Sequence, residues 1–168
     1  MTDKSRAIPD FPMLPILHRR QIEAELIRDF YASMVPTLGK DAAQAIIHDA
    51  VRASAIRHAE GFAAAAENGS SLEHFITIQK HWTAENALEI DVTRRDAEHF
   101  EFNVTRCRYA EMYHAMGLGE IGHLLSCNRD GAFSEGYDDK LAFSRTQTIM
   151  QGAACCDFKY RYPATSEP

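Results

Sequence analysis

The hydrophobic pattern changes from a helical to an alternating period at about residue 87. Before that point apolar side chains recur at helical spacing, which predicts three helices, over residues 15–34, 41–67 and 70–86. After it, apolar and polar residues alternate, as is typical of half-buried strands. The alternation predicts a hairpin of two strands, over residues 88–93 and 100–105. Helices that precede a sheet are typical of the α+β class.

The rest of the chain is predicted to complete a roughly four-stranded antiparallel sheet with a helical insertion. Helical periodicity places the insertion at residues 108–116 and 120–127, and a loop that contains Asp130, Gly131 and Gly136 is expected after it. Two further strands are expected, over residues 141–150 and 156–162. The expected fold is therefore N-terminal helices packed on this sheet.

The length and charge of the chain limit its class. At 168 residues it has the size of one domain, which we expect over residues 14–163 after a loose N-terminal arm at residues 1–13. The net charge of −6 argues against a nucleic-acid partner, and the small cluster at His18, Arg19 and Arg20 is interpreted as solvated. No apolar run approaches the ~20 residues that a membrane span requires. Without a secretory signal, we expect a cytoplasmic protein with reduced thiols.

The second predicted helix is rich in small side chains. Several of them fall on one helical stripe with a few larger residues: Ala42, Ala45, Ile46, Ala50, Ala53, Ile56 and Phe62. Small residues allow helices to approach one another closely. Such packing can lie within the chain or between subunits, so a homo-oligomer is among the expected partners.

All four cysteines lie in the last third of the chain, at Cys107, Cys127, Cys155 and Cys156. Reactive or metal-binding chemistry needs thiols, imidazoles and carboxylates together. His123 and Cys127 are four residues apart, so one helix face can carry both. An imidazole beside a thiol favours a thiolate nucleophile, and Asp130 could orient that imidazole. A surface histidine beside a structural cysteine is the alternative.

Strand parity predicts an inward-facing arginine. In the strand expected over residues 141–150, Arg145 and Gln147 share a face with Leu141 and Phe143. A buried arginine requires an anion, which could be a protein carboxylate or a substrate carboxylate. Arg106 poses the same question in the hairpin, with a strand end that twists towards solvent as its alternative.

Metal binding is the rival use of the same groups. Cys107, Cys127, Cys156 and one histidine could form a tetrahedral site, but their spacings are long and no C-x-x-C occurs. The chain also lacks a glycine-rich phosphate loop, a G-x-S-x-G and an H-E-x-x-H motif. We therefore expect no cofactor, with a structural zinc as the minor alternative.

Three blocks of the sequence carry a family resemblance. They are residues 105–111 (TRCRYAE), residues 117–122 (GLGEIG) leading to 127–130 (CNRD), and residues 145–150 (RTQTIM) with Gly152 and 155–158 (CCDF). In order and spacing these blocks resemble the L-2-amino-thiazoline-4-carboxylic acid hydrolase family. One departure follows Gly136, where Tyr137-Asp138-Asp139 replaces an expected asparagine-proline turn.

The resemblance implies a hydrolase that opens a small five-membered ring, as in the conversion of 2-aminothiazoline-4-carboxylate to N-carbamoyl-cysteine. A cysteine could attack directly, or a carboxylate could activate water. The catalytic candidates are Cys127, Asp130, Cys156, Asp157 and His123. Arg145 is the best candidate to hold a substrate carboxylate, because its guanidinium can donate two parallel hydrogen bonds. The substrate-binding candidates are Arg145, Gln147, Thr146, Thr148, Cys107, Glu111 and Glu120.

Two other classes of function remain open. One is a non-catalytic small-molecule or metal-binding protein that uses the same cysteine-rich pocket. The other is an accessory subunit whose cysteines belong to the core. A ring-opening assay separates the enzyme from both.

Overall fold

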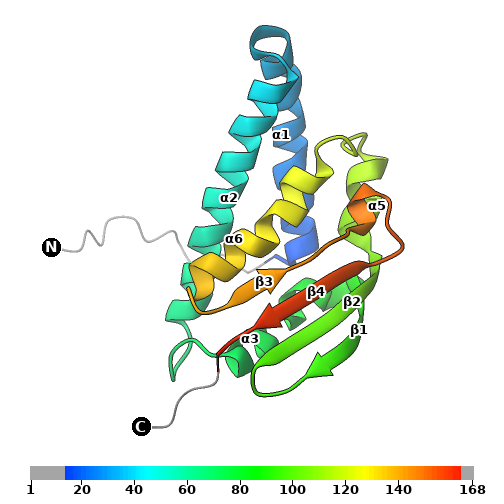
Figure 1. Ribbon diagram of the computed structural model, residues 1–168. Coiled ribbons are helices and arrows are strands. Elements are labelled where there is room, and N and C mark those ends of the chain that lie inside the picture. Colours follow the sequence, from blue (N-terminus) through cyan, green and yellow to red (C-terminus); the bar gives the residue numbers. More distant parts are fainter. Residues whose placement is uncertain (1–13, 164–168) are drawn as a thin grey trace, which may run out of the picture.

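Two long helices form an antiparallel hairpin that extends beyond the rest of the molecule (Figure 1). The structure is a computed structural model that describes residues 14–163, and the expected arm at residues 1–13 lies outside them. Helix α1 (Ile16–Leu38) and helix α2 (Lys40–Ala64) are joined by Gly39 alone, at φ 81°. Glycine adopts a positive φ without steric cost, which permits this abrupt reversal.

Short helices lead from the hairpin to the sheet. The hydroxyl of Ser71 caps α3 (Leu72–Ile78) by accepting a hydrogen bond from the backbone N–H of His74 at 3.1 Å. A second short helix, α4 (Lys80–Thr83), follows, and then a 3₁₀ turn at Ala84–Asn86. The single helix predicted over residues 70–86 is therefore divided at Gln79.

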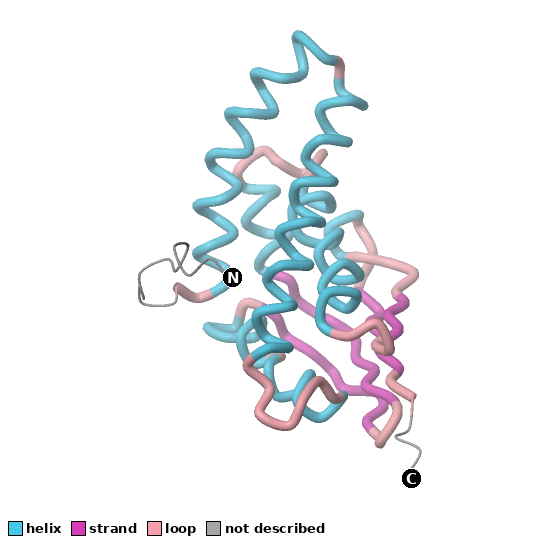
Figure 2. Tube along the Cα trace, turned by 90° about the vertical axis from the view of Figure 1, so that its left-hand side faces the viewer, coloured by secondary structure: helices cyan, strands magenta, loops and turns pink. Residues whose placement is uncertain are grey.

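The sheet has four antiparallel strands in the order β1-β2-β4-β3. They are β1 (Leu88–Arg95), β2 (His99–Cys107), β3 (Ala142–Ser144) and β4 (Cys156–Arg161). The predicted hairpin and the α+β class are confirmed. Between β2 and β3 lie α5 (Arg108–Ala115), a π-helical turn at His123–Cys127 and α6 (Asn128–Tyr137). The helices cover one face of the sheet (Figure 2).

The prediction of a loop around Asp130, Gly131 and Gly136 is wrong, because all three residues lie in α6. A Cβ added to Gly136 would lie 2.5 Å from the carbonyl oxygen of Ile56 in α2. The glycine therefore permits the close crossing of α2 and α6 and does not form a turn. Glycine in a sequence is compatible with either use.

The strand predicted over residues 141–150 is much shorter, since β3 ends at Ser144. Beyond it the carboxylate of Asp157 accepts hydrogen bonds from the backbone N–H groups of Thr146 and Gln147, each at 2.9 Å. These bonds hold the segment out of the sheet ladder. The expected inward position of Gln147 is wrong, because its side chain is exposed.

The buried face of α2 is not the predicted stripe. It comprises residues at a spacing of four: Ala43, Ile47, Val51, Ala55 and Ala59. Alanines surround this helix, so the pattern hardly distinguishes one face from another, and packing against α1 and α6 decides. Ala43, Ala55 and Ala59 thus serve packing within the chain, whereas the alanines of the predicted stripe are exposed. A homo-oligomer stays a prediction.

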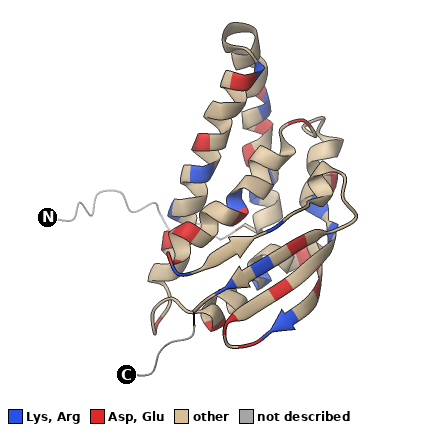
Figure 3. Ribbon diagram, in the orientation of Figure 1, with Lys and Arg blue, Asp and Glu red and all other residues tan. Residues whose placement is uncertain are grey.

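On helix α1, several apolar side chains are exposed and one charged side chain is buried. Ile22, Leu26 and Phe30 are exposed, whereas Arg20 is only 4% exposed. The interpretation of Arg20 as a solvated residue is therefore wrong. Elsewhere, Lys and Arg are interspersed with Asp and Glu along the helices and strands (Figure 3). Within residues 14–163 no helix combines the length and the apolar character needed to cross a membrane.

Candidate functional site

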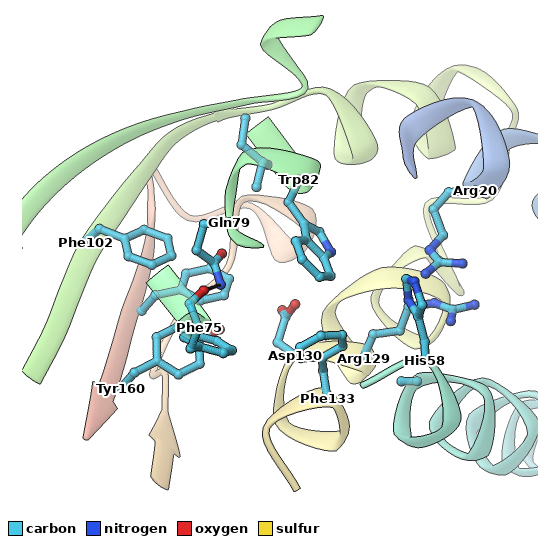
Figure 4. A pocket seen from close by; sticks show the side chains of 13 residues that line it. Arg20, His58, Phe75, Gln79, Trp82, Phe102, Arg129, Asp130, Phe133 and Tyr160 are labelled. Carbon is cyan, nitrogen blue, oxygen red and sulfur yellow. Dashed lines mark hydrogen bonds between the residues drawn. The ribbon is translucent and has the colours of Figure 1, made fainter. Parts of the chain in front are cut away.

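A cavity lies between the helices and the covered face of the sheet (Figure 4). Its volume is about 50 Å³, enough for roughly four waters. Six aromatic side chains contribute to its wall: Phe75, Trp82, Phe102, Phe133, Phe158 and Tyr160. Its polar residues are Arg20, His58, Gln79, Arg129 and Asp130.

The aromatic side chains form flat apolar surfaces. The ring of Trp82 meets that of Phe133 edge to face at a centroid distance of 4.9 Å, and Phe102 stacks on Phe158 at 4.9 Å. The ring centroid of His58 lies 6.2 Å from that of Trp82 and 6.0 Å from that of Phe133. Walls of this kind suit a small planar molecule, and a few polar groups then set its orientation.

Asp130 brings a carboxylate to the cavity from the first turn of α6. Arg145 donates a hydrogen bond to it through Nη1 and a second one to the carbonyl oxygen of Cys127 at 3.2 Å. The guanidinium of Arg145 also lies over the ring of Phe158, 5.2 Å from its centroid. The anion that the buried arginine requires is thus a protein carboxylate. The role of Arg145 in binding a substrate carboxylate stays a prediction.

The pKa of Asp130 is raised to about 6, because burial disfavours the charged form more than Arg145 favours it. The side chain of Asp130 is 25% exposed, and that of Arg145 is 13% exposed. Since Asp130 lines the cavity, a ligand there would meet a carboxylate that titrates near neutral pH.

A second charged group occupies the other side of the cavity (Figure 4). Glu23 of α1 accepts hydrogen bonds from Arg20 at 2.5 Å and from Arg129 at 3.1 Å. Arg129 also donates to the carbonyl oxygen of Leu125 at 2.8 Å. Burial and, after it, the charge of Arg20 lower the pKa of His58 to about 4, so its imidazole is neutral at pH 7.

Sequence reasoning missed this charged group. Arg20 shares a helical face with the buried residues Leu17 and Ala24, three before it and four after it. That spacing was a usable signal that Arg20 points inward. Trp82 lies at helical spacing from Phe75 and Ile78, which predicts a buried face for it. For His58 no comparable signal was found, because it contacts the cavity only through the packing of distant elements.

The thiols lie near Asp130 but are not activated. Burial raises the pKa of Cys107 to about 11 and that of Cys127 to about 12, and it also raises the pKa of Cys156. The charge of Asp130 contributes to all three shifts, so the thiols lie close to the carboxylate. In the described part of the chain, none of the three thiols lines the cavity and no hydrogen bond joins His123 to Cys127.

Two of the thiols have backbone partners. The sulfur of Cys107 accepts from the N–H of Ala110 at 3.4 Å, which caps α5, and that of Cys156 accepts from the N–H of Ile149 at 3.2 Å. Across residues 14–163 no group of three or more His, Cys, Asp or Glu side chains is placed to hold a metal ion.

The other predicted site residues lie away from the cavity. Thr146 and Gln147 bind Asp157 near the surface, and Thr148 caps the 3₁₀ turn Ile149–Gln151. Two exposed glutamates pair with basic residues instead: Glu111 with Arg106 at 2.8 Å and Glu120 with Lys40 at 2.5 Å. Their predicted role in substrate binding stays a prediction.

Arg106 faces solvent because the strand register shifts beside it. Glu89 pairs with Arg106 and Ile90 with Val104, so Thr105 is skipped as a bulge. The extra residue reverses the alternation that buries Phe100, Phe102 and Val104. The expected alternative of a strand end that turns outward is what the structure contains.

Comparison with known proteins gives a family and a fold. Residues 19–160 match the family model described as L-2-amino-thiazoline-4-carboxylic acid hydrolase. Among solved structures, the chain is similar to the crystal structure of the phenol-responsive sensory domain of the transcription activator PoxR with phenol. The TM-score is 0.55 at 15% identity, over 93% of this chain and 79% of that chain. Such a likeness shows the fold alone. No curated protein matches the chain.

Proposed function

Because the chain belongs to the L-2-amino-thiazoline-4-carboxylic acid hydrolase family, we propose that it hydrolyses a small five-membered ring of the cyclic-amidine type in the cavity at Asp130. One observation carries the proposal. Within residues 14–163 Asp130 is the only acidic residue on the cavity wall, and its pKa is raised to about 6. A general base works best when its pKa lies near the operating pH.

For 2-aminothiazoline-4-carboxylate the steps follow from this placement. Asp130 takes a proton from water while the water oxygen bonds to the carbon of the protonated amidine. The carbon–sulfur bond of the ring then breaks, and the sulfur leaves as a thiol with the proton that Asp130 held. The hydroxyl on the carbon loses its proton to solvent as the carbonyl forms. One water is consumed, and N-carbamoyl-cysteine is the product.

Arg145 has a positioning role in this scheme. Its guanidinium holds the Asp130 carboxylate and is itself held by the carbonyl oxygen of Cys127. The water route is better supported than direct attack by a thiol, because the raised pKa of Cys127 and that of Cys156 leave little thiolate at neutral pH.

A ring-opening assay tests the proposal. Purified protein is incubated with cyclic amidines, thiolactams and hydantoin-like rings, and the products are identified by mass spectrometry and by release of free thiol. We expect turnover of at least one cyclic amidine that carries a carboxylate. If none of these ring classes is opened, the hydrolase proposal is wrong.

A non-catalytic binding protein is the second candidate. The enclosed aromatic cavity with a neutral His58 favours it, as does the solved structure of similar fold, a phenol-responsive sensory domain with phenol. Its signature would be saturable binding of a small ring without turnover in the same assay. A cytoplasmic location and a small-molecule carboxylate as partner remain proposals under either candidate.

A further inference from the structure

The charges around the cavity do not balance. Asp130 is paired with Arg145, so that pair carries no net charge. On the other side, Arg20 and Arg129 are 4% and 9% exposed and share the single carboxylate of Glu23. Glu23 also accepts from Arg19 at 3.0 Å. Two buried guanidinium groups therefore depend on one carboxylate that a third arginine also uses.

An excess of buried positive charge is costly unless an anion neutralises it. The pKa of the neighbouring His58 imidazole reflects the same excess of positive charge. After burial, the largest contributions that lower the pKa of His58 to about 4 come from Arg20, Arg19 and Arg129, and only Glu23 opposes them. Figure 4 shows His58, Arg20 and Arg129 on one side of the cavity and Phe75, Phe102 and Tyr160 on the other. Asp130 lies between them, beside Trp82 and Phe133.

We infer that Arg20 and Arg129 form the anion site that holds the carboxylate of a ring molecule in this cavity. The carboxylate would bind at these guanidinium groups through charge-assisted hydrogen bonds, in competition with Glu23. The ring would then rest against Trp82 and Phe133, next to Asp130. This role differs from the one the sequence predicted for Arg145, whose charge Asp130 already neutralises.

The inference rests on the proposed function and deepens it, since it names the residues that bind the carboxylate in the same cavity, but its test needs no turnover. Trp82 is the single tryptophan of the sequence and lines the cavity, so its fluorescence reports occupancy directly. The probes are thiophene-2-carboxylate and thiophene-2-carboxamide. Both have the same shape and neither is a substrate for ring opening, and only the first is an anion.

We expect thiophene-2-carboxylate to bind at least ten-fold more tightly than the carboxamide. Glu23→Gln removes the competing carboxylate and should raise the affinity for the anion further, without changing that for the carboxamide. A gain of affinity cannot arise from misfolding, so this variant decides the matter even if others are unstable. Arg129→Gln should abolish the preference for the anion.

Arg106→Gln is the matched control, because Arg106 is an exposed arginine paired with Glu111 and Glu89. It should leave both affinities unchanged. Equal affinity of the native protein for the two probes, or an unchanged preference in Glu23→Gln, would overturn the inference. If the ring-opening assay fails while the preference for the anion holds, the anion site stands and the hydrolase proposal falls. The reverse result removes only the anion site.

Discussion

Asp130 reaches the cavity from the first turn of α6, and Arg145 holds its carboxylate there. Its neighbours divide into groups that the sequence resemblance contains and groups that it does not. Asp130, Arg145 and Cys127 lie within the quoted blocks, whereas Arg20, His58 and Trp82 lie before all of them. At the scale of residues, the proposed chemistry therefore depends on the blocks that carry the family resemblance, and its surroundings depend on the helices that precede the sheet.

Replacement of Asp130 by asparagine tests its role as the base. We expect kcat to fall at least about 100-fold, the lower end of what a general base contributes, while thiophene-2-carboxylate still binds. Cys127→Ser is the control for the thiol route and should retain turnover, because that thiol is protonated at neutral pH. Loss of turnover in Cys127→Ser with intact binding would instead support a covalent cysteine.

The same carboxylate predicts a pH profile. Asp130 accepts a proton only when ionised, so kcat/KM should be low in acid, rise as the pH passes about 6 and level off above it. Arg145 lowers the pKa of Asp130, so Arg145→Gln should move the inflection to higher pH. If kcat/KM of the native protein does not change between pH 5 and 8, that would argue against Asp130 as the base.

At the scale of elements, the crossing of α2 and α6 sets the position of Asp130. Gly136 allows this crossing, because its α-hydrogen faces the backbone of Ile56. Both helices contribute to the cavity, through Ala55 and His58 of α2 and through Arg129, Asp130 and Phe133 of α6. The distance between the two helices therefore governs the width of the cavity.

Gly136→Ala should destabilise the fold. The added Cβ would meet the Ile56 carbonyl oxygen at 2.5 Å, so backbone would have to move, and overpacking of this kind costs about 1–3 kcal/mol. Gly131→Ala in the same helix is the control. Its Cβ would make an ordinary contact of 3.5 Å with Phe143, and alanine favours a helix by up to about 1 kcal/mol. Urea unfolding of both variants measures the difference. Equal stability would contradict the close crossing.

At the scale of the whole molecule, the cavity joins the helical layer to the sheet. Its wall includes Arg20 of α1, Trp82 of α4, Phe102 of β2 and Tyr160 of β4, so a bound ligand contacts elements from both layers. Occupancy of the cavity should accordingly stabilise the complete fold.

We predict that thiophene-2-carboxylate at a hundred times its Kd raises the Tm by about 5–10 °C, from about 2.7 kcal/mol of binding free energy and the usual slope for a domain of this size. Differential scanning fluorimetry measures the shift. Ala55→Leu should remove it, because the larger side chain enters the cavity from α2. An unchanged shift in that variant would place the ligand elsewhere.

The class of fold could be predicted because it is written in local periodicity. Alternation over a few residues identifies β1, β2 and β4, and helical spacing identifies α1, α2 and α5, since each pattern depends on neighbours along the chain. Glycines and alanines misled the prediction at α6 and on α2, because small residues fit a turn, an exposed surface or a close contact equally well.

The residues of the candidate site divide in the same way. Sequence alone identified Asp130, Arg145 and the thiols as a group with chemistry, and it carried the family resemblance. It could not place Arg20 against Arg129 or His58 against Trp82, because those neighbours come from helices far apart along the chain. Tertiary packing alone decides which charges share a cavity. Burial then shifts the pKa of Asp130 towards neutrality, and the burial of the nearby thiols keeps them protonated.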